Sequence, residues 1–394
     1  MSLACAAGPP ERHSQACADC LRRTWLIARL AGRIELARRA GPSAGAGALR
    51  ELLALPDATL LAAIAGQERA RIGRELERVD PAGLLDACAD AGLVAVCRHA
   101  PDYPARLLDL DDAPAVLHVT RAGAGRLARM AGGTLDEGPS AVAIVGTRRA
   151  SAEGLEIARA LGRGLAAAGV TVVSGMALGA DSAAHAGALE AEGATVAVLA
   201  CGADVQYPPS KHALHDRIAR AGCVVSELPP GFGPHRWCFP ARNRIIAALA
   251  QMTVVVEAAE RSGSLITAEL AADLGREVGA VPGPVTSWRA AGTNALLRDG
   301  ATLVRDARDA LDAIVGVEVE PAAAAAAASR HRIAGLEPRL ADLLDAVEAG
   351  RDTVAALAGH PAEAGAIVAG LTELELLGLL RRATGGRYVR AVRS

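Results

Sequence analysis

Five short segments of the chain combine glycines, hydroxyls and cations in a way that suits anion binding. They are Val145-Gly-Thr-Arg148, Ser174-Gly175 continuing to Asp181, Tyr207-Pro-Pro-Ser-Lys211, Phe239-Pro-Ala-Arg-Asn-Arg244 and Ser262-Gly-Ser-Leu-Ile-Thr267. Glycine allows a tight turn, and the first turn of a helix offers backbone amides to a phosphate. Arginine adds a planar, permanently charged donor. The segments therefore predict phosphate binding at several turns.

Each segment also has a purely structural interpretation. The turn at Gly146 can be a simple helix cap, Asp181 can cap the next helix, and His185 fits a packed position better than a chemical one. We expect Arg242 and Arg244 in the first turn of a helix, where cations oppose the helix dipole. Either a bound anion or an acidic partner within the protein would explain them.

The few aromatic residues gather near these segments. Tyr207, Phe232, Trp237, Phe239 and Trp288 lie in one stretch of the chain. Rings beside a phosphate-binding edge are typical of a site for single-stranded nucleic acid, because bases stack on them. The alternative is that the rings fill the core, and we expect this for Trp288.

Short β-branched runs alternate with Ala-rich helical stretches from Ala141 onwards, which predicts an α/β fold. We expect an extended Rossmann-like core with a parallel sheet covered on both faces. Ligands of such sheets bind beyond the carboxyl ends of the strands, so the five segments should line one groove. The predicted strands are Val142–Val145, Val170–Ser174, Thr195–Ala200, Cys223–Ser226, Thr253–Glu257 and Val278–Val281, with helices at 154–168, 180–192, 210–221, 241–251 and 264–275.

The remaining parts of the chain predict smaller domains on either side. Residues 1–80 read as a small helical domain of the SAM or helix–hairpin–helix kind, after a disordered start at 1–15. The Rossmann-like domain spans 81–315, with one extra strand in 81–140, and an Ala-rich linker spans 316–335. Residues 336–394 predict a winged helix, from helices at 338–349, 352–358 and 362–377 and a hairpin turning at Gly385-Gly386. Its arginine-rich end suits duplex DNA or a protein partner.

The composition restricts the kind of partner and location. The formal net charge is −2, so a nucleic-acid site has to be a local basic pocket. Lys211 is the sole lysine of the chain. We expect no membrane span, because no uninterrupted apolar run is long enough, and no signal peptide. Eight scattered cysteines suit reduced thiols in the cytoplasm.

Catalytic and metal motifs have little support. The sequence has no G-x-S-x-G elbow between a predicted strand and a helix, since Gly41-Pro-Ser-Ala-Gly45 falls in a loop, and no H-E-x-x-H or paired Cys/His arrangement. The turns match neither a dinucleotide fingerprint nor a Walker A loop. We therefore expect no enzymatic activity, no catalytic residue and no cofactor. Cys17-x-x-Cys20, with Cys5 and His13 upstream, could make a zinc site, but one such pair at the N-terminus is a weak signal and we expect no metal.

In this order, the motifs resemble the DprA/Smf family of DNA-processing proteins. The similar stretches include the five segments, Ser226-Glu227, Val281-Pro-Gly283, Tyr103-Pro104 and Leu371 to Tyr388. The resemblance implies a dimer that binds single-stranded DNA, protects incoming strands and loads the recombinase RecA, as in natural transformation. By position, the implied DNA-contacting residues are Arg148, Ser174, Gly175, Lys211, Arg242, Asn243, Arg244, Ser262, Gly263 and Ser264. Ala180, where the family often has Ile, and the Cys17-x-x-Cys20 pair depart from the family pattern.

Two other functions compete with this hypothesis. A Rossmann-type nucleotide phosphoribohydrolase would carry P-G-G-x-G-T-x-x-E, but the stretch from Ser262 lacks most of these glycines and has Leu270 in place of the glutamate. A winged-helix transcription regulator with a sensory core would bind duplex DNA through residues 336–394.

Overall fold

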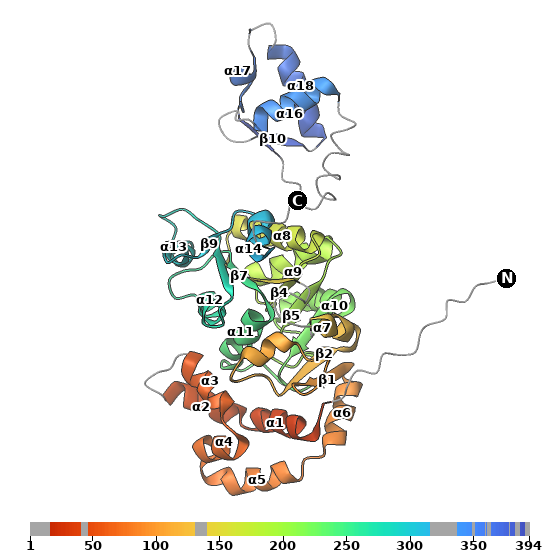
Figure 1. Cartoon of the computed structure of the whole chain (residues 1–394), viewed down its shortest axis with the longest axis vertical. Helices are drawn as coiled ribbons and strands as arrows, with labels where there is room; N and C mark the ends of the chain where they lie inside the picture. The colour runs from red at the N-terminus through yellow and green to blue at the C-terminus, as the bar shows by residue number, and fades with distance from the viewer. Residues whose placement is uncertain are drawn as a thin grey trace, which may run out of the picture. The chain divides into compact units, whose positions relative to one another are not determined.

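The computed structural model describes residues 16–40, 46–130, 140–315, 337–348, 351–358, 360, 364–377, 379–382 and 387–390 (Figure 1). The chain forms two compact units, Met1–Gly316 and Val317–Ser394. The predicted disordered start at 1–15 and the predicted linker at 316–335 lie outside the described residues, as do Cys5 and His13.

A nine-stranded sheet forms the centre of the first unit, in the order β1-β2-β6-β5-β4-β3-β7-β8-β9. All six predicted strands are present and lie parallel to one another. Their ends agree with the prediction to within about two residues. They are β3 (Ala141–Val145), β4 (Thr171–Ser174), β5 (Thr195–Val198), β6 (Cys223–Ser226), β7 (Met252–Val255) and β8 (Glu277–Ala280).

The edges of this sheet differ from the prediction. Residues 81–140 contribute two strands rather than one: β1 (Leu93–Cys97) and β2 (Val116–Thr120) form an antiparallel pair, and β2 joins β6. At the other edge, β9 (Thr302–Leu303) pairs with β8. Short apolar runs such as Leu93–Cys97 cannot be distinguished from buried helix by periodicity, so pairing with β2 decides their conformation.

Helices cover both faces of the sheet, as the alternation along β3 shows. Val142 and Ile144 pack against α8 (Ala152–Ala167) and α9 (Ala180–Glu190). Ala143 and Val145 point to the opposite face, in a core shared with α11 (Cys238–Leu249) and α12 (Gly263–Asp273). Burial on both faces explains why these strands are continuously apolar. The other helices of this region are α10 (His212–Ala221), α13 (Ala291–Arg298) and α14 (Ala307–Val315).

The direction of chain progression reverses at β3. From β3 the chain proceeds through β4 and β5 to β6 on one side, whereas β7, β8 and β9 lie on the other. Loops that leave adjacent strands at such a point diverge to opposite faces, and a crevice opens between them. The carboxyl ends of β3, β4 and β7 are therefore where the fold favours a ligand site.

The N-terminal helices pack against this core within the same compact unit. Leu26, Leu30 and Ile34 share a buried cluster with Trp237 and Ala241 of the core. The backbone amide of Trp237 also donates a hydrogen bond of 2.9 Å to a Glu35 carboxylate oxygen. These helices are α1 (Ala18–Arg29), α2 (Ala31–Ala40), α3 (Ala46–Ala54), α4 (Asp57–Ile64), α5 (Arg69–Glu77) and α6 (Pro81–Asp90), and α7 (Ala124–Arg129) follows β2.

The second unit has the predicted order of helices and hairpin. It contains α16 (Pro338–Glu348), α17 (Val354–Leu357) and α18 (Ala364–Leu376), then β10 (Leu380–Arg382) paired antiparallel with β11 (Tyr388–Arg390). Leu344, Leu371, Leu374 and Tyr388 form its core. The predicted turn at Gly385-Gly386 lies outside the described residues.

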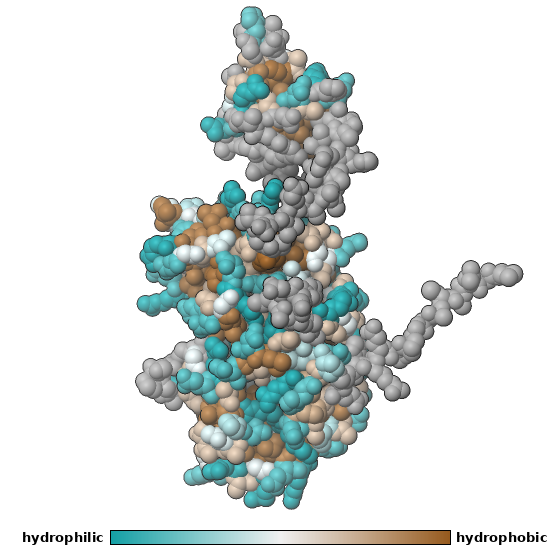
Figure 2. All heavy atoms as spheres, viewed as in Figure 1, coloured by the Kyte–Doolittle hydropathy of each residue, from teal (hydrophilic) through white to brown (hydrophobic). Residues whose placement is uncertain are grey.

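Hydrophilic and hydrophobic side chains are mixed over the surface shown in Figure 2. Hydrophobic residues are exposed on the side of the core that carries α13, where Val285 is 94% exposed and Trp288 is 60% exposed. Among the described helices, none combines the length and the apolar character needed to cross a membrane.

Candidate nucleic-acid interface

A groove lies along the carboxyl edge of the sheet at β3 and β7. It has a volume of about 520 Å³ and is lined by parts of four predicted segments, at Gly146–Arg149, Ala177 and Asp181, Phe239–Asn243, and Ser262–Thr267. A smaller extension of about 50 Å³ adds Gly175, Tyr207 and Pro208 to this lining. Arg148, Ala177, Phe239 and Arg242 line both parts. The fold thus brings all five predicted segments to one groove.

The first segment contributes a side chain rather than a helix terminus. The carboxylate of Glu257 accepts hydrogen bonds from the Ser151 amide at 2.9 Å and the Ser151 hydroxyl at 2.6 Å. Ser151 in turn caps α8 by accepting from the Gly154 amide at 2.9 Å. An internal anion therefore occupies the N-terminus of α8, and the structural interpretation of this turn as a helix cap is correct.

Arg148 is exposed and lies over the ring of Phe239, with its Cζ 4.8 Å from the ring centroid. The Phe239 ring is half-buried and lies 5.9 Å from the Tyr207 ring. A guanidinium held against an aromatic face keeps its charge available to a phosphate. Arg148, Phe239 and Tyr207 thus form a row of one cation and two aromatic rings. Such a row suits phosphates and bases that follow one another along a strand.

The second segment is held by Asp181. Its carboxylate accepts from the Gly175 amide at 3.1 Å and the Ala177 amide at 3.4 Å. Burial raises the pKa of Asp181 above its ordinary value, while the nearby charge of Arg242 and these amides act in the opposite direction. Asp181 therefore fixes the loop from inside, which differs from the expected helix cap.

Ser174 does not present a free hydroxyl to the groove. The residue is completely buried, and its Oγ donates to the Ile144 carbonyl at 2.6 Å. The predicted DNA contact through this side chain is at odds with that placement, because the hydroxyl ties β4 to β3. His185 is likewise buried, with Nδ1 2.7 Å from Thr195 Oγ1, so the expectation of a packed histidine is confirmed.

Arg242 supports the floor of the groove. It is 5% exposed, and its Nη1 donates to the carbonyls of Gly175 and Val198, both at 2.6 Å. A Cβ on Gly175 would lie 1.9 Å from that nitrogen, so the absence of a side chain there makes the contact possible. The buried guanidinium joins the ends of β4 and β5 and places a positive charge beneath the groove.

Arg244 is an internal ion-pairing residue. Its two Nη atoms bind both carboxylate oxygens of Glu227 at 2.8 and 2.7 Å, and its Nε lies 2.7 Å from Asp112 Oδ2. It is 1% exposed. Burial disfavours its charge, but Glu227 and Asp112 together raise the pKa of Arg244. The acidic partner considered from the sequence is present, and the predicted DNA contact is replaced by this structural role.

The helix that carries these residues begins earlier than predicted, at Cys238. Arg242 and Arg244 consequently lie in its second turn, so their charges do not oppose the dipole at its first turn. Pro240 fits the first turn, where its missing amide has no partner to lose. Asn243 is half-buried and its Nδ2 donates to the Gly263 carbonyl at 3.3 Å, linking α11 to the start of α12.

The fifth segment places a helix N-terminus on the groove. The Ser262 hydroxyl caps α12 by accepting from the Ser264 amide, and the two serine hydroxyls lie 2.7 Å apart. Gly263 is exposed, and a Cβ added to it would meet no atom within 4 Å. The positive end of the α12 dipole and these hydroxyls together suit a phosphate.

Two cationic residues are placed differently from what the sequence predicts. Lys211 is half-buried in the turn that follows Pro208, but it is not among the lining residues of the groove. Arg38 of α2 is among them, although no motif indicated it. It comes from the helical domain, whose contact with the groove depends on tertiary packing.

The aromatic residues that are close in the sequence separate in space. Tyr207 and Phe239 meet at the groove, and the Phe232 ring lies 5.2 Å from that of His235. Trp237 is completely buried, whereas Trp288 is 60% exposed under the Arg289 guanidinium. The expectation that Trp288 fills the core is wrong, and only two of the five rings can serve a groove-bound base.

Comparison with known proteins decides the family. The model of the family described as DNA recombination-mediator protein A matches residues 94–315. The chain belongs to this family. A putative DNA processing protein DprA of Mycobacterium tuberculosis is 43% identical over 288 residues, covering 69% of this chain and 71% of that protein. The DNA processing protein DprA of Streptococcus pneumoniae is 37% identical over 244 residues, covering 61% and 77%.

A solved structure supports the same assignment. The X-ray structure of DNA processing protein A from Streptococcus pneumoniae covers 77% of this chain and 97% of its own, at 30% identity and a TM-score of 0.56. The stretch matched by the recombination-mediator family contains the groove segments from Gly146 to Thr267. Arg38 lies before that stretch, so the helical domain adds a cation to the family's core.

Proposed function

We propose that this recombination-mediator family member binds single-stranded DNA in the groove at the carboxyl edge of its sheet. The observation that carries the proposal is the meeting of Arg148, the Phe239 and Tyr207 rings and the N-terminus of α12 along one opening. Cations and helix amides suit the phosphates, and the rings suit the bases. Asn243, Ser262, Gly263, Ser264 and Arg38 complete the proposed contact surface, and Lys211 extends it beyond Pro208.

Single-stranded rather than duplex DNA is favoured by the aromatic part of the groove. Bases can stack on Tyr207 and Phe239 only when they are unpaired and accessible, whereas phosphates of either form could meet Arg148. Ser174, Gly175, Arg242 and Arg244 act in this proposal as supports of the groove rather than as ligands, because their polar atoms bind other parts of the protein.

The test is fluorescence anisotropy of the full chain with a labelled oligonucleotide, single-stranded against duplex, at two salt concentrations. We expect tighter binding to the single strand and an affinity that falls as salt rises, because phosphate contacts release counterions. Equal affinity for both forms, or an affinity insensitive to salt, would contradict the proposed role of the groove in binding single-stranded DNA. Sequence-specific duplex binding by residues 336–394 would instead favour the regulator hypothesis.

The proposal extends to partners and setting that the family resemblance implies. We propose that the protein acts without catalysis and without a cofactor, as a cytoplasmic homodimer that protects incoming single strands and loads RecA, as in natural transformation. Leu270, where a phosphoribohydrolase would have its glutamate, is 4% exposed on α12 and offers no acid to a substrate. RecA loading is tested by the rate at which RecA acquires DNA-dependent ATP hydrolysis on single strands with and without this protein.

The second unit is proposed to be a winged helix. The order of α16, α17, α18 and the β10–β11 hairpin supports this, as does the bridge that pairs Thr353 with Arg387 beside the hairpin. A variant truncated after residue 315 lacks this second unit and tests its role. If the variant keeps its affinity for single-stranded DNA, the second unit would be assigned to binding a protein partner or duplex DNA.

A further inference from the structure

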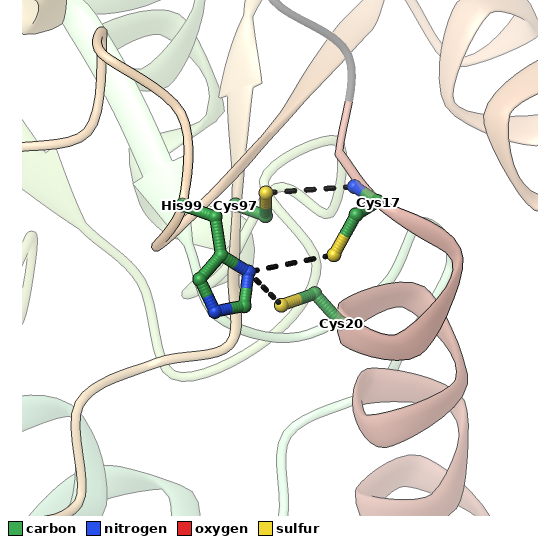
Figure 3. Close-up of side chains that lie close together, drawn as sticks. All are labelled: Cys17, Cys20, Cys97 and His99. Atoms are coloured by element: carbon green, nitrogen blue, oxygen red, sulfur yellow. Dashed lines mark hydrogen bonds between the residues drawn. The ribbon is translucent and has the colours of Figure 1, made fainter.

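Four metal-ligating side chains meet where the first helix joins the edge of the sheet. Cys17 and Cys20 lie at the start of α1, Cys97 ends β1, and His99 follows two residues later. Each offers one ligand atom, and the four atoms lie within 4.8 Å of one another (Figure 3). We propose that these residues bind one Zn²⁺ ion in a Cys₃His site.

The distances suit tetrahedral coordination. Nδ1 of His99 lies 3.5 Å from Cys17 Sγ and 3.4 Å from Cys20 Sγ. With Zn–S bonds of about 2.3 Å and Zn–N bonds of about 2.0 Å, sulfur and nitrogen at two corners of a tetrahedron are about 3.5 Å apart. The imidazole nitrogen and these two sulfurs therefore already stand at the separation that a shared zinc ion requires, and the third sulfur lies within 4.8 Å of each of them. In Figure 3 the Cys17 and Cys20 sulfurs face His99 Nδ1, and Cys97 Sγ lies beside the Cys17 amide.

The surroundings of the cluster are those of a structural metal site. The Cys17 amide donates to Cys97 Sγ at 3.4 Å, which stabilises a thiolate and orients it. Cys20 and Cys97 are each 2% exposed, whereas Cys17 and His99 are exposed, so an ion can enter from one side. Four protein ligands leave no open coordination position, so the ion would hold structure rather than activate water.

A redox-active Cys17–Cys20 pair accounts for less of the geometry. A disulfide uses only two sulfurs. It would not explain why Cys97 and the His99 imidazole lie beside the same two cysteines. Softer ligands in a Cys₃His set favour zinc over magnesium or calcium, which prefer oxygen. Among the described residues, the structure thus completes the Cys-x-x-Cys pair with residues about eighty positions away. Cys5 and His13, the partners considered from the sequence, lie outside the described residues.

The consequence is a link between the helical domain and the sheet. The Ala16 amide donates to the Ala95 carbonyl at 3.2 Å, so the segment before α1 already lies against β1. Zinc would fix this junction, and α2, which follows α1, supplies Arg38 to the groove. The site therefore holds in place a domain that contributes to the proposed DNA surface, although zinc binding itself does not depend on DNA.

The first test uses the unaltered full chain, expressed with zinc and purified without chelator under anaerobic conditions. We expect one zinc ion per chain by mass spectrometry of the metal, and X-ray absorption that shows three sulfur ligands and one nitrogen ligand. Replacement by Co²⁺ should produce the visible bands of tetrahedral cobalt and a sulfur-to-cobalt charge-transfer band. A metal-free protein with a Cys17–Cys20 disulfide, or with all thiols free and no cobalt spectrum, would overturn the proposal.

The second test identifies the ligands. Cys97→Ser combined with His99→Ala should abolish stoichiometric zinc, whereas the matched pair Cys5→Ser with His13→Ala should retain it. The reverse result would assign the site to the upstream residues and refute the Cys₃His set. If the first pair does not fold, the Cys5→Ser/His13→Ala variant decides the question, because both ligand sets contain three cysteines and one histidine. Retention of one zinc ion with three sulfur ligands and one nitrogen ligand in that variant supports the proposed set, and loss of the zinc refutes it.

Discussion

The Arg148 guanidinium lies against the Phe239 ring, 4.8 Å from its centroid, although about ninety positions separate the two residues in the chain. The contact joins the loop after β3 to the first turn of α11 across the groove. One residue brings permanent positive charge and the other an aromatic face, so their separate removal should affect DNA binding in different ways.

Reversal of charge at Arg148 should weaken single-strand binding. A charge-assisted hydrogen bond contributes about 1.5–3 kcal/mol, so we expect Arg148→Glu to lower affinity by about ten- to a hundredfold. The slope of log K against log salt should become shallower by about 0.7 for each single-strand phosphate that the variant no longer neutralises. Anisotropy titrations at several salt concentrations measure both quantities.

Arg74→Glu provides the matched control, because Arg74 is an exposed arginine of α5 that does not line the groove. Its affinity should stay near that of the unaltered protein. Lys211→Glu should give an intermediate loss, as Lys211 lies beyond the lining residues. If Arg74→Glu weakened binding as much as Arg148→Glu, overall charge rather than the groove would govern affinity.

Removal of the ring at Phe239 should lower affinity without changing its salt dependence. Phe239→Leu keeps an apolar side chain for packing but loses the stacking face, which contributes about 1–3 kcal/mol per base. Trp288→Leu removes an exposed ring outside the groove and should leave affinity unchanged. A shallower salt slope in Phe239→Leu would show that the ring acts only by positioning Arg148.

Loss of the buried cation at Arg244 should destabilise the fold. Arg244→Met removes the cation that Glu227 and Asp112 share and leaves Asp112 only the more distant Arg50, 3.7 Å away. Breaking a buried pair in this way costs about 3–5 kcal/mol. Urea unfolding measures the loss, and Arg298→Met, at an arginine with a 77% exposed side chain, should leave the unfolding free energy nearly unchanged. An unfolding free energy unchanged by Arg244→Met would reopen a direct role in DNA binding.

A methyl group at Gly175 should disturb the groove from below. The new Cβ would displace the Arg242 guanidinium from the Gly175 and Val198 carbonyls, leaving buried polar groups without partners at a cost of about 1–3 kcal/mol. Both stability and single-strand affinity should therefore fall in Gly175→Ala. Gly263→Ala tests the opposite case, since its Cβ meets open space, and normal stability is expected there.

Acid should destabilise the first unit through His185. Burial, with a smaller effect of the Arg242 charge, lowers the pKa of His185 from 6.5 to about 3. Between these values the unfolded chain binds one more proton than the folded one, so stability is fully present above pH 6.5 and falls as pH decreases. The slope contributed by one such histidine is at most about 1.4 kcal/mol per pH unit.

The variant His185→Gln isolates this contribution. Thr195 Oγ1 donates to the Val172 carbonyl, so it accepts from His185 Nδ1, and a glutamine amide can replace that donor. Unfolding free energies between about pH 7.5 and pH 4.5 should depend less steeply on pH in the variant. Identical slopes in the two proteins would mean that His185 does not titrate on unfolding in this range.

The alternation of apolar strands with Ala-rich helices was enough to predict the parallel part of the sheet and the turns at its carboxyl edge. Those signals are local, because a buried strand and the glycine that follows it are neighbours in the chain. The same locality explains why Gly146, Arg148 and Ser262 could be recognised as turn residues at all. It also explains why only one strand, without bounds, was predicted within 81–140, where β1 and β2 each depend on the other for their conformation.

Only the tertiary structure decided which polar residues face the groove and which bind one another. The carboxylate of Glu257 binds Ser151 at the start of α8, and that of Glu227 binds Arg244. Arg38 lines the groove together with residues more than a hundred positions away. The same is true of Cys97 and His99 beside Cys17 and Cys20. Residue type tells that a side chain can donate, accept or bind a metal, but its partner depends on the path of the backbone, which is set by the packing of the whole unit.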